Sequence, residues 1–333
     1  MDEYPKKIRI GQIGLGHSHG EGKMSAVRKL SELFEVIGYA EADEAWIEKR
    51  GHLQAYVDLP RMSVEELINE CDAILIESDI PELIKYARIC VQAGKHIHMD
   101  KPVYGSVTEF EELLEIASHQ KLVIQMGYMY RYNPAVVQCI DMIKNQKLGE
   151  IFSIHGEIST QDYSDTKRRL AKYPAGPLYI MGAHLIDLIV YILGEPDQIK
   201  VFLKSTGLDG VCLADNNLAV LEYEKALATV KASSVEVNGW GRRQLVVSGS
   251  RGTVEIKPME NETTMTFSDV EIAIKHYEDM KKSIPIADIP KNERYDEMMR
   301  ALYRYITGIE DNPFSYEHDL LVHKLIAEIC KEA

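Results

Sequence analysis

A chain of 333 residues with 45% hydrophobic content is long enough for two folded domains, each with its own core. Its formal net charge of −14 at pH 7 argues against nucleic-acid and anionic-membrane partners, because both are bound by clustered Lys and Arg. The five Cys residues form no C-x-x-C pair, and we find neither an export leader nor an apolar run of about 18 residues, so we expect a cytoplasmic protein with reduced thiols.

The first part of the chain alternates short apolar runs with stretches of helical spacing. This alternation predicts β-α-β units and a parallel sheet up to about residue 128. The predicted strands are residues 8–13, 36–40, 73–77, 96–99 and 123–126, and helical spacing is found in residues 64–68 and 83–91.

A glycine turn follows the first predicted strand, with the sequence Gly14-Leu15-Gly16-His17-Ser18-His19-Gly20. Glycines at the first and third positions let the backbone approach a pyrophosphate, and the next helix points its N-terminal amides at the anion. The full fingerprint has a third Gly or Ala where this chain has His19. The turn predicts a dinucleotide site, and an ordinary strand-to-helix turn is the alternative.

A carboxylate follows the second predicted strand at the spacing of a ribose ligand. Glu41 comes roughly twenty residues after the turn, where an acid accepts hydrogen bonds from the ribose hydroxyls. The next residues, Ala42 and Asp43, are not basic and would not neutralise a 2′-phosphate. We therefore expect NAD rather than NADP, with a solvated loop acid as the alternative for Glu41.

The fourth predicted strand leads directly into Asp100-Lys101-Pro102. Ligands bind at the carboxyl ends of the strands in this architecture, and Pro102 stiffens the turn that carries Lys101. A lysine beside a nicotinamide donates to a substrate hydroxyl and stabilises the alkoxide that develops as hydride leaves. An exposed lysine in an ordinary turn is the alternative.

The second part of the chain has longer strand patterns with few helices between them, which predicts a mostly antiparallel sheet. The predicted strands are residues 151–158, 200–205, 218–223, 228–235, 244–247 and 253–256. A helix over about 178–193 would cover one face of this sheet, and association of subunits would cover the other. The chain closes with an amphipathic helix over about 316–331.

Together these motifs resemble those of the glucose–fructose oxidoreductase, inositol dehydrogenase and rhizopine catabolism family (Gfo/Idh/MocA). The resemblance rests on the glycine turn, Glu41, residues 94–102 and 127–134, residues 176–187, which are similar to the family's catalytic helix, and loosely on 246–256. It implies an α/β protein with an N-terminal Rossmann doubly wound parallel sheet. It also implies a C-terminal α+β domain with a large, mostly antiparallel open sheet, and NAD(P)-dependent oxidation of sugars or cyclitols.

We place the NAD(P)-binding domain at residues 1–128 and the substrate-binding and oligomerisation domain at 129–333, with the option that the C-terminal helix packs back on the first. The family's Glu-Lys-Pro motif falls on Asp100-Lys101-Pro102, so the resemblance makes Lys101 the catalytic lysine. Its catalytic helix supplies His184 as general base, since an imidazole titrates near neutral pH. A buried structural histidine is the alternative for His184.

Other residues follow from the same resemblance. The substrate-binding candidates are Arg131, Tyr132, Asp187 and Tyr163, and Tyr130 stands where a second Arg often sits. The cofactor-binding candidates are Gly14, Gly16, His17, Ser18, His19, Glu41, Ser78, Asp79, Asp100, Lys101 and Tyr128.

One position departs from the family. An Asp commonly precedes the catalytic His by four residues and stabilises its charged form, but this chain has Ile180 there. Asp162, Asp165 or Tyr179 would have to substitute, and the sequence does not choose among them.

Two histidines in the glycine turn invite a metal interpretation. We expect no metal, because no acid or Cys joins His17 and His19 at a recognised ligand spacing. The expected protein is an NAD-dependent dehydrogenase acting on a small sugar or polyol, assembled as a homodimer or homotetramer. The alternatives are an NAD-binding sensor with little turnover and an enzyme that uses NAD transiently for elimination or glycoside cleavage.

Overall fold

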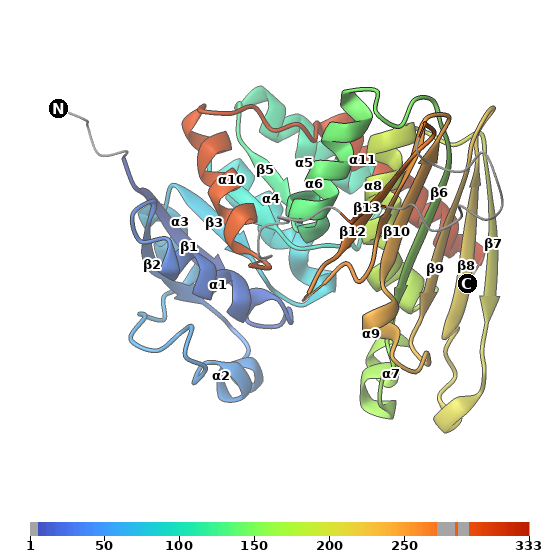
Figure 1. The fold of residues 1–333 in the computed structure, drawn as a ribbon. Coiled ribbons are helices and arrows are strands. Elements are labelled where there is room, and N and C mark those ends of the chain that lie inside the picture. Colours follow the sequence, from blue (N-terminus) through green and yellow to red (C-terminus); the bar gives the residue numbers. More distant parts are fainter. Residues whose placement is uncertain (1–5, 261, 272–283, 286–292, 333) are drawn as a thin grey trace. The chain divides into compact units, whose positions relative to one another are not determined.

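The structure is a computed structural model that describes residues 6–260, 262–271, 284–285 and 293–332. The chain forms two compact units (Figure 1). The first comprises Met1–Met129 with Glu293–Leu320, and the second Tyr130–Asn292 with Leu321–Ala333. Among the described helices, none combines the length and the apolar character needed to cross a membrane.

A five-stranded parallel sheet forms the core of the first unit, in the order β2-β1-β3-β4-β5. Its strands are β1 (Ile8–Ile13), β2 (Phe34–Ala40), β3 (Ala73–Ile76), β4 (His96–Met99) and β5 (Ile124–Met126). Every residue of β3 is fully buried, as expected of a central strand covered on both faces. This is the predicted Rossmann sheet.

The helices of the first unit begin where the sequence supplies caps. They are α1 (Gly20–Lys29), α2 (Glu44–Arg50), α3 (Val64–Glu70), the short η1 (Ile80–Glu82), α4 (Leu83–Gln92) and α5 (Val107–His119). Ser63 and Ser106 each form a capping box with the Glu three residues later, which satisfies amides at the starts of α3 and α5.

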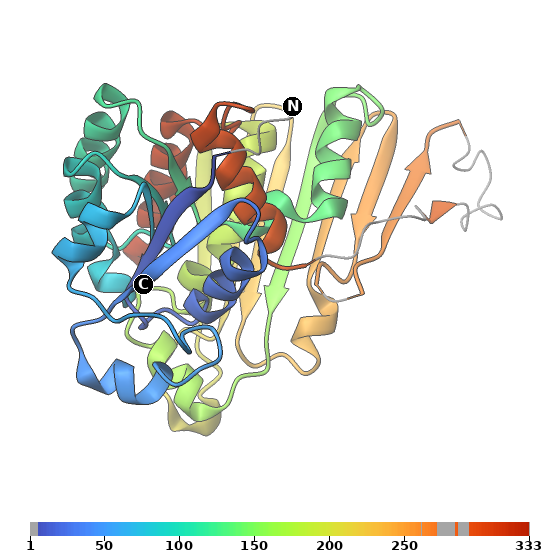
Figure 2. The same ribbon diagram turned by 90° about the vertical axis from the view of Figure 1, so that its left-hand side faces the viewer.

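A distant segment completes the first unit. Helix α10 (Asp296–Thr307) lies against α1, as both views show (Figures 1 and 2). The rings of Phe34 and Tyr303 meet edge to face at 6.0 Å, and Gln125 Nε2 donates to Met298 O at 3.0 Å. Helix α11 (Tyr316–Ile329) begins in this unit, where Tyr316 donates to Leu122 O, and its later residues are assigned to the second unit.

An eight-stranded sheet dominates the second unit, in the order β13-β12-β11-β10-β6-β9-β8-β7. All of its described neighbours pair antiparallel except β6 and β9. The strands are β6 (Ile151–Ser159), β7 (Gln198–Lys204), β8 (Asn216–Glu222), β9 (Leu227–Ser233), β10 (Gln244–Gly249), β11 (Gly252–Ile256), β12 (Met265–Asp269) and β13 (Ile284–Pro285). The predicted large, mostly antiparallel sheet is confirmed.

Helices pack against one face of this sheet. They include α6 (Pro134–Lys144), η3 (Leu178–Gly182) and α8 (Ala183–Leu193), while α7 (Ser164–Leu170) and α9 (Gly239–Arg242) are short. A Cβ on Gly156 of β6 would lie 2.9 Å from Leu185, so a glycine there lets α8 approach the sheet closely. The predicted single helix over 178–193 is instead a π-helical turn, η3, followed by α8.

Other boundaries also differ from the prediction. Strands β12 and β13 were not predicted, and β3 ends at Ile76, so that Glu77 begins the loop beyond it. Short connecting elements complete the described chain: η2 (Met129–Tyr132), η4 (Leu208–Gly210) and η6 (Cys330–Glu332).

Candidate functional site

The glycine turn lies at the carboxyl end of β1, packed against the loop that follows β3. Gly14 has a φ of +91°, and a Cβ there would lie 2.3 Å from Ser78 Cα. A Cβ on Gly16 would lie 2.6 Å from Asp79 N. The structure thus brings four predicted cofactor residues together, and it shows that the neighbouring loop itself leaves no room for a side chain at either glycine.

The donors of this turn fit a dinucleotide. Leu15 N donates to Glu41 Oε2 at 2.7 Å, so the predicted ribose carboxylate lies beside the turn, and its other oxygen accepts from Asp43 N at 2.9 Å. Within the described chain, the amides of Gly16 and Ser18 have no acceptor. Free amides just before the start of α1 suit a pyrophosphate, and an acid at Glu41 suits a ribose.

Two guanidinium groups that were not predicted from the sequence lie beside this site. Arg50 Nη1 donates to Leu15 O at 2.8 Å and also to His17 O. Arg61 Nη2 donates to Glu41 O at 3.0 Å. Only the two residues after Glu41 were considered as partners of a 2′-phosphate, whereas Arg61 comes from twenty residues further along the chain.

Asp100 is the centre of a buried polar cluster in the first unit. Its Oδ2 lies 2.9 Å from His17 Nδ1 and 3.1 Å from His19 Nδ1, and it also accepts a bond from Lys23 Nζ. Its Oδ1 accepts from Lys101 N at 2.7 Å. Burial opposes ionisation of this side chain, but His17, Lys23 and His19 hold the pKa of Asp100 well below its usual value.

A second acid completes the cluster. Glu77 Oε1 accepts from Lys23 Nζ at 2.8 Å and lies 3.7 Å from His98 Nε2, while His98 Nδ1 lies 2.8 Å from Gln125 Oε1. Burial raises the pKa of Glu77 well above its usual value and lowers that of His98. Burial thus disfavours the charged forms of Glu77 and His98, and Asp100 is the acid whose ionised form is favoured beside the ammonium of Lys23.

Lys101 stands at the carboxyl end of β4, with 3% of its surface exposed, and is joined to Pro102 by a cis peptide bond. Tyr128, another predicted cofactor residue, is also buried and follows β5, the neighbouring strand. The predicted residues of the first unit therefore gather at one edge of the sheet, where ligands bind in this architecture.

Although no acid joins His17 and His19 at a recognised ligand spacing in the sequence, the fold brings Asp100 to both imidazoles. Ligand atoms of His17, His19 and Asp100 all lie within 4.8 Å of one another, although 81 residues separate His19 from Asp100. The ammonium of Lys23, however, binds the same oxygen of Asp100 that both imidazoles approach. The ammonium of Lys23 thus already provides the positive charge beside Asp100, and for this reason we still expect no metal there.

The second unit carries the other predicted residues. His184 and Asp187 lie on α8, and both are buried. Arg131 forms a two-pronged ion pair with Asp187, with Nε 3.0 Å from Oδ2 and Nη2 2.5 Å from Oδ1. The sequence assigned both residues to substrate oxygens, whereas the structure shows them bound to each other across η2 and α8.

The ring of Tyr130 lies beside the predicted general base. Its centroid is 5.1 Å from that of His184, and its hydroxyl donates to Glu260, which also pairs with Arg243. Burial and the Glu260 carboxylate raise the pKa of Tyr130, so the phenol keeps its proton. Sequence reasoning missed Glu260 and Arg243, which lie more than 100 residues from Tyr130.

The three candidates for the role of the missing acid each have a different partner in the structure. Asp162 accepts from the hydroxyl of Thr160 at 2.7 Å. Asp165 is 91% exposed and pairs with Arg168, and Tyr179 stacks on Tyr173 with centroids 6.0 Å apart.

The two remaining substrate candidates differ in exposure. Tyr132 is buried in η2, whereas Tyr163 is 87% exposed at the start of α7. Tyr163 is therefore open to solvent in the second unit.

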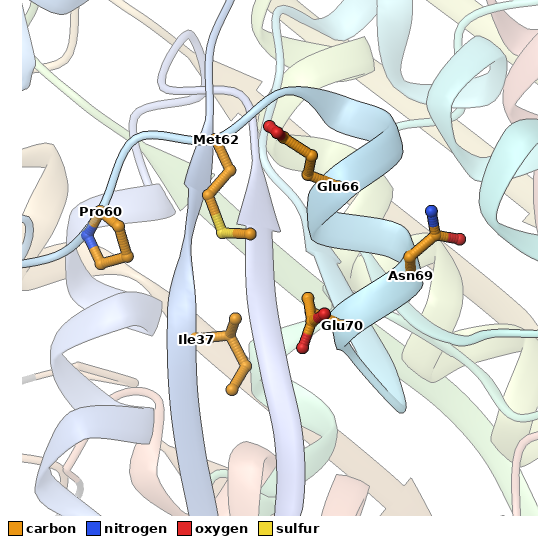
Figure 3. A pocket seen from close by; sticks show the side chains of 6 residues that line it. All are labelled: Ile37, Pro60, Met62, Glu66, Asn69 and Glu70. Atoms are coloured by element: carbon orange, nitrogen blue, oxygen red, sulfur yellow. The ribbon is translucent and has the colours of Figure 1, made fainter.

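A hollow of about 480 Å³ lies elsewhere on the first unit (Figure 3). It is lined by Ile37, Pro60, Met62, Glu66, Asn69 and Glu70. Ile37 is in the middle of β2, away from the carboxyl ends of the strands. Glu66 caps α3 and Glu70 pairs with Arg9, so these carboxylates already serve the fold.

The model of the oxidoreductase family with an NAD-binding Rossmann fold matches residues 8–128, and that of the Gfo/Idh/MocA C-terminal domain matches 136–255. With the observed fold, these matches define an oxidoreductase with an NAD-binding Rossmann unit. The chain therefore belongs to the Gfo/Idh/MocA family.

Named relatives are distant. Myo-inositol 2-dehydrogenase of Thermotoga maritima is 25% identical over 79% of this chain and 78% of its own. The uncharacterised oxidoreductase YhhX of Escherichia coli is 24% identical over 57% of this chain, and the match spans 54% of YhhX.

Solved structures share the fold at low identity. UDP-N-acetylglucosamine 3-dehydrogenase from Acidithiobacillus ferrooxidans has a TM-score of 0.78 at 17% identity, covering 97% of both chains. An oxidoreductase from Desulfitobacterium hafniense, described as NADPH-dependent, has a TM-score of 0.82 at 18% identity, covering 98% of this chain and 96% of its own.

Proposed function

We propose that the protein transfers hydride between NAD and a secondary alcohol or ketone of a sugar, cyclitol or related polyol. The observation that carries this proposal is the shared edge of the first sheet, where the amides of the glycine turn, Glu41 and Lys101 are found together. Inositol and nucleotide-sugar dehydrogenases among the similar proteins support the substrate class.

In this proposal two side chains act on the reacting alcohol. When bound, the nicotinamide provides the hydride acceptor or donor. Lys101 hydrogen-bonds the substrate oxygen and stabilises the alkoxide, and His184 takes up the hydroxyl proton. The Arg131–Asp187 pair holds η2 to α8, and we assign it with Tyr132 and Tyr163 to the substrate side.

A screen of sugars, inositols and their keto forms with NAD and NADP, followed at 340 nm, tests the proposal. Net NADH formation supports it. Dinucleotide binding without turnover of any substrate would instead support a sensor, which the apolar Ile180 in place of an acid favours. Product release without net NADH would support transient use of NAD in elimination or glycoside cleavage.

The choice between NAD and NADP rests on Glu41. Replacing Glu41 by Ala should weaken NAD binding about tenfold and reduce the preference for NAD over NADP, because the ribose diol loses a charged acceptor. Titration of both dinucleotides by calorimetry measures the ratio of their dissociation constants. Arg61→Ala is the matched control, expected to weaken NADP more than NAD, and an unchanged ratio in Glu41→Ala contradicts the assignment.

We further propose that the large sheet mediates assembly into a homodimer or homotetramer. Strand pairing places Phe202, Leu218, Val220 and Val246 on the face opposite Gly156 and α8. Phe202 is 52% exposed in the single chain, so it is available to a second copy.

Replacing Phe202 by Asp should lower the oligomeric state, because a buried charge would be left without a partner at the interface. Light scattering after size exclusion measures the mass. Leu208→Asp, at an equally exposed site outside the strands, should leave the mass unchanged. An assembly as large in the Phe202 variant as in the parent chain would exclude this face.

All five Cys residues are free in the structure, four of them buried. Free thiols support a reducing cytoplasmic setting, which remains part of the proposal.

A further inference from the structure

Asp100 joins two segments that the proposed function uses separately. Its Oδ2 contacts the imidazoles of the glycine turn, and its Oδ1 accepts a hydrogen bond from the backbone amide of Lys101. Because an ionised carboxylate only accepts, His19 Nδ1 carries the proton of its bond to Asp100. His17 Nδ1 lies 2.9 Å from the same oxygen and accepts from His19 N at 3.4 Å, so the two imidazoles are also linked to each other.

Lys23 makes this arrangement possible. Its side chain is fully buried on α1 and binds Asp100 and Glu77. Without Lys23, the Asp100 carboxylate would be a buried charge whose described contacts are the two imidazoles and the backbone amide of Lys101. Lys23 also follows His19 by four residues, so both side chains leave the same face at the start of α1.

We propose that Lys23, His17 and His19 are positioning residues that couple occupancy of the glycine turn to the placement of Lys101 through Asp100. This inference rests on the proposed dinucleotide site. Anything that fixes the turn fixes the two imidazoles, and the imidazoles fix the carboxylate that holds the Lys101 amide. Lys23, together with the two imidazoles, favours the ionised form of that carboxylate, so that it can accept from His19, Lys23 and the Lys101 amide at once.

The test uses ADP, which carries the pyrophosphate but no nicotinamide, so that it reaches the glycine turn without the group that would contact Lys101. Hydrogen exchange of peptides spanning residues 97–104 is measured by mass spectrometry with and without ADP. In the parent protein we expect exchange of these amides to slow about fivefold or more. Calorimetry measures ADP affinity in parallel.

Lys23→Met should lose this protection while ADP affinity changes less than about threefold. Because a lone charge at Asp100 can prevent folding, Lys23→Met/Asp100→Asn is the second variant: it removes both charges, so we expect it to fold and still to lack the coupling. Asp100→Glu keeps the carboxylate and should retain part of the protection. Lys95→Met is the matched control, since Lys95 binds Cys71 O at the opposite end of β4 and should leave the protection intact.

The outcomes separate this inference from the proposed function. If the parent protein binds neither ADP nor NAD, the proposed cofactor site fails. If it binds ADP but residues 97–104 are not protected, or are protected equally in the double variant, the dinucleotide site stands and the coupling is overturned.

Discussion

Replacing Lys101 by Ala is expected to abolish turnover while leaving NAD affinity nearly unchanged. The ammonium contributes to the charge that develops on the substrate oxygen, and removal of one such donor lowers kcat by a factor on the order of 10³. NAD binding depends mainly on the amides of the glycine turn and on Glu41, which the substitution does not touch. Steady-state kinetics on a substrate found by the screen, with calorimetry of NAD, measures both quantities.

Lys95→Ala is the control for this prediction. It removes a lysine from the same unit, next to the first residue of the same strand, where no ligand is expected. It should retain kcat. Full activity in the Lys101 variant would refute the role assigned to this lysine.

Replacing Asp187 by Ala should lower the free energy of unfolding of the second unit by about 3–5 kcal/mol, because Arg131 would be left as a buried charge without its carboxylate. The two side chains are 1% and 0% exposed, so water cannot compensate for the loss. Denaturant titration followed by Trp fluorescence measures the effect. Of the two Trp residues, Trp46 lies in the first unit and Trp240 in the second, so a Trp46→Phe background reports on the second alone.

The double variant Arg131→Met/Asp187→Leu is the informative companion. With both charges gone, part of the stability should return, since neither charge of the pair remains buried without the other. If it regains stability without turnover, the pair also serves the substrate. A loss below about 1 kcal/mol in Asp187→Ala would show that the pair matters little to the fold.

The fold was predicted from short motifs and apolar runs that are local in the sequence. The glycine turn, the acid after β2 and the Asp100-Lys101 turn were found because each motif is short and lies where a strand ends. The strands of the first sheet were predicted to within about two residues because buried parallel strands are rich in Ile, Val, Leu and Met and alternate with segments of helical spacing. Strands β12 and β13 lack such a run and were missed.

Contacts between distant segments could not be predicted in the same way. His17 and His19 were expected to face a pyrophosphate, but the nearest partner of both imidazoles is Asp100, which only the parallel pairing of β1, β3 and β4 brings close. The sequence contains one signal for Lys23. This lysine stands next to the apolar residues Met24, Ala26 and Val27 and four residues after His19, in a helix whose other residues at these positions are buried.

Partners of predicted residues were missed for the same reason. The link from Tyr130 to Glu260 spans 130 residues of chain, and no pattern of a single sequence encodes it. Likewise, Arg131 and Asp187 were each recognised as polar residues near the proposed reaction, but their mutual pairing required the three-dimensional arrangement of η2 and α8.

The return of residues 293–320 to the first unit has a consequence for biosynthesis. Helix α10 and the start of α11 leave the ribosome well after the strands of the first sheet, yet they supply Tyr303 to Phe34 and Tyr316 to Leu122. The dinucleotide unit therefore cannot finish folding during translation of its own N-terminal strands and must wait until residues 293–320 have been made. A truncated gene product ending near residue 128 would expose the surfaces these segments cover and would be prone to aggregate.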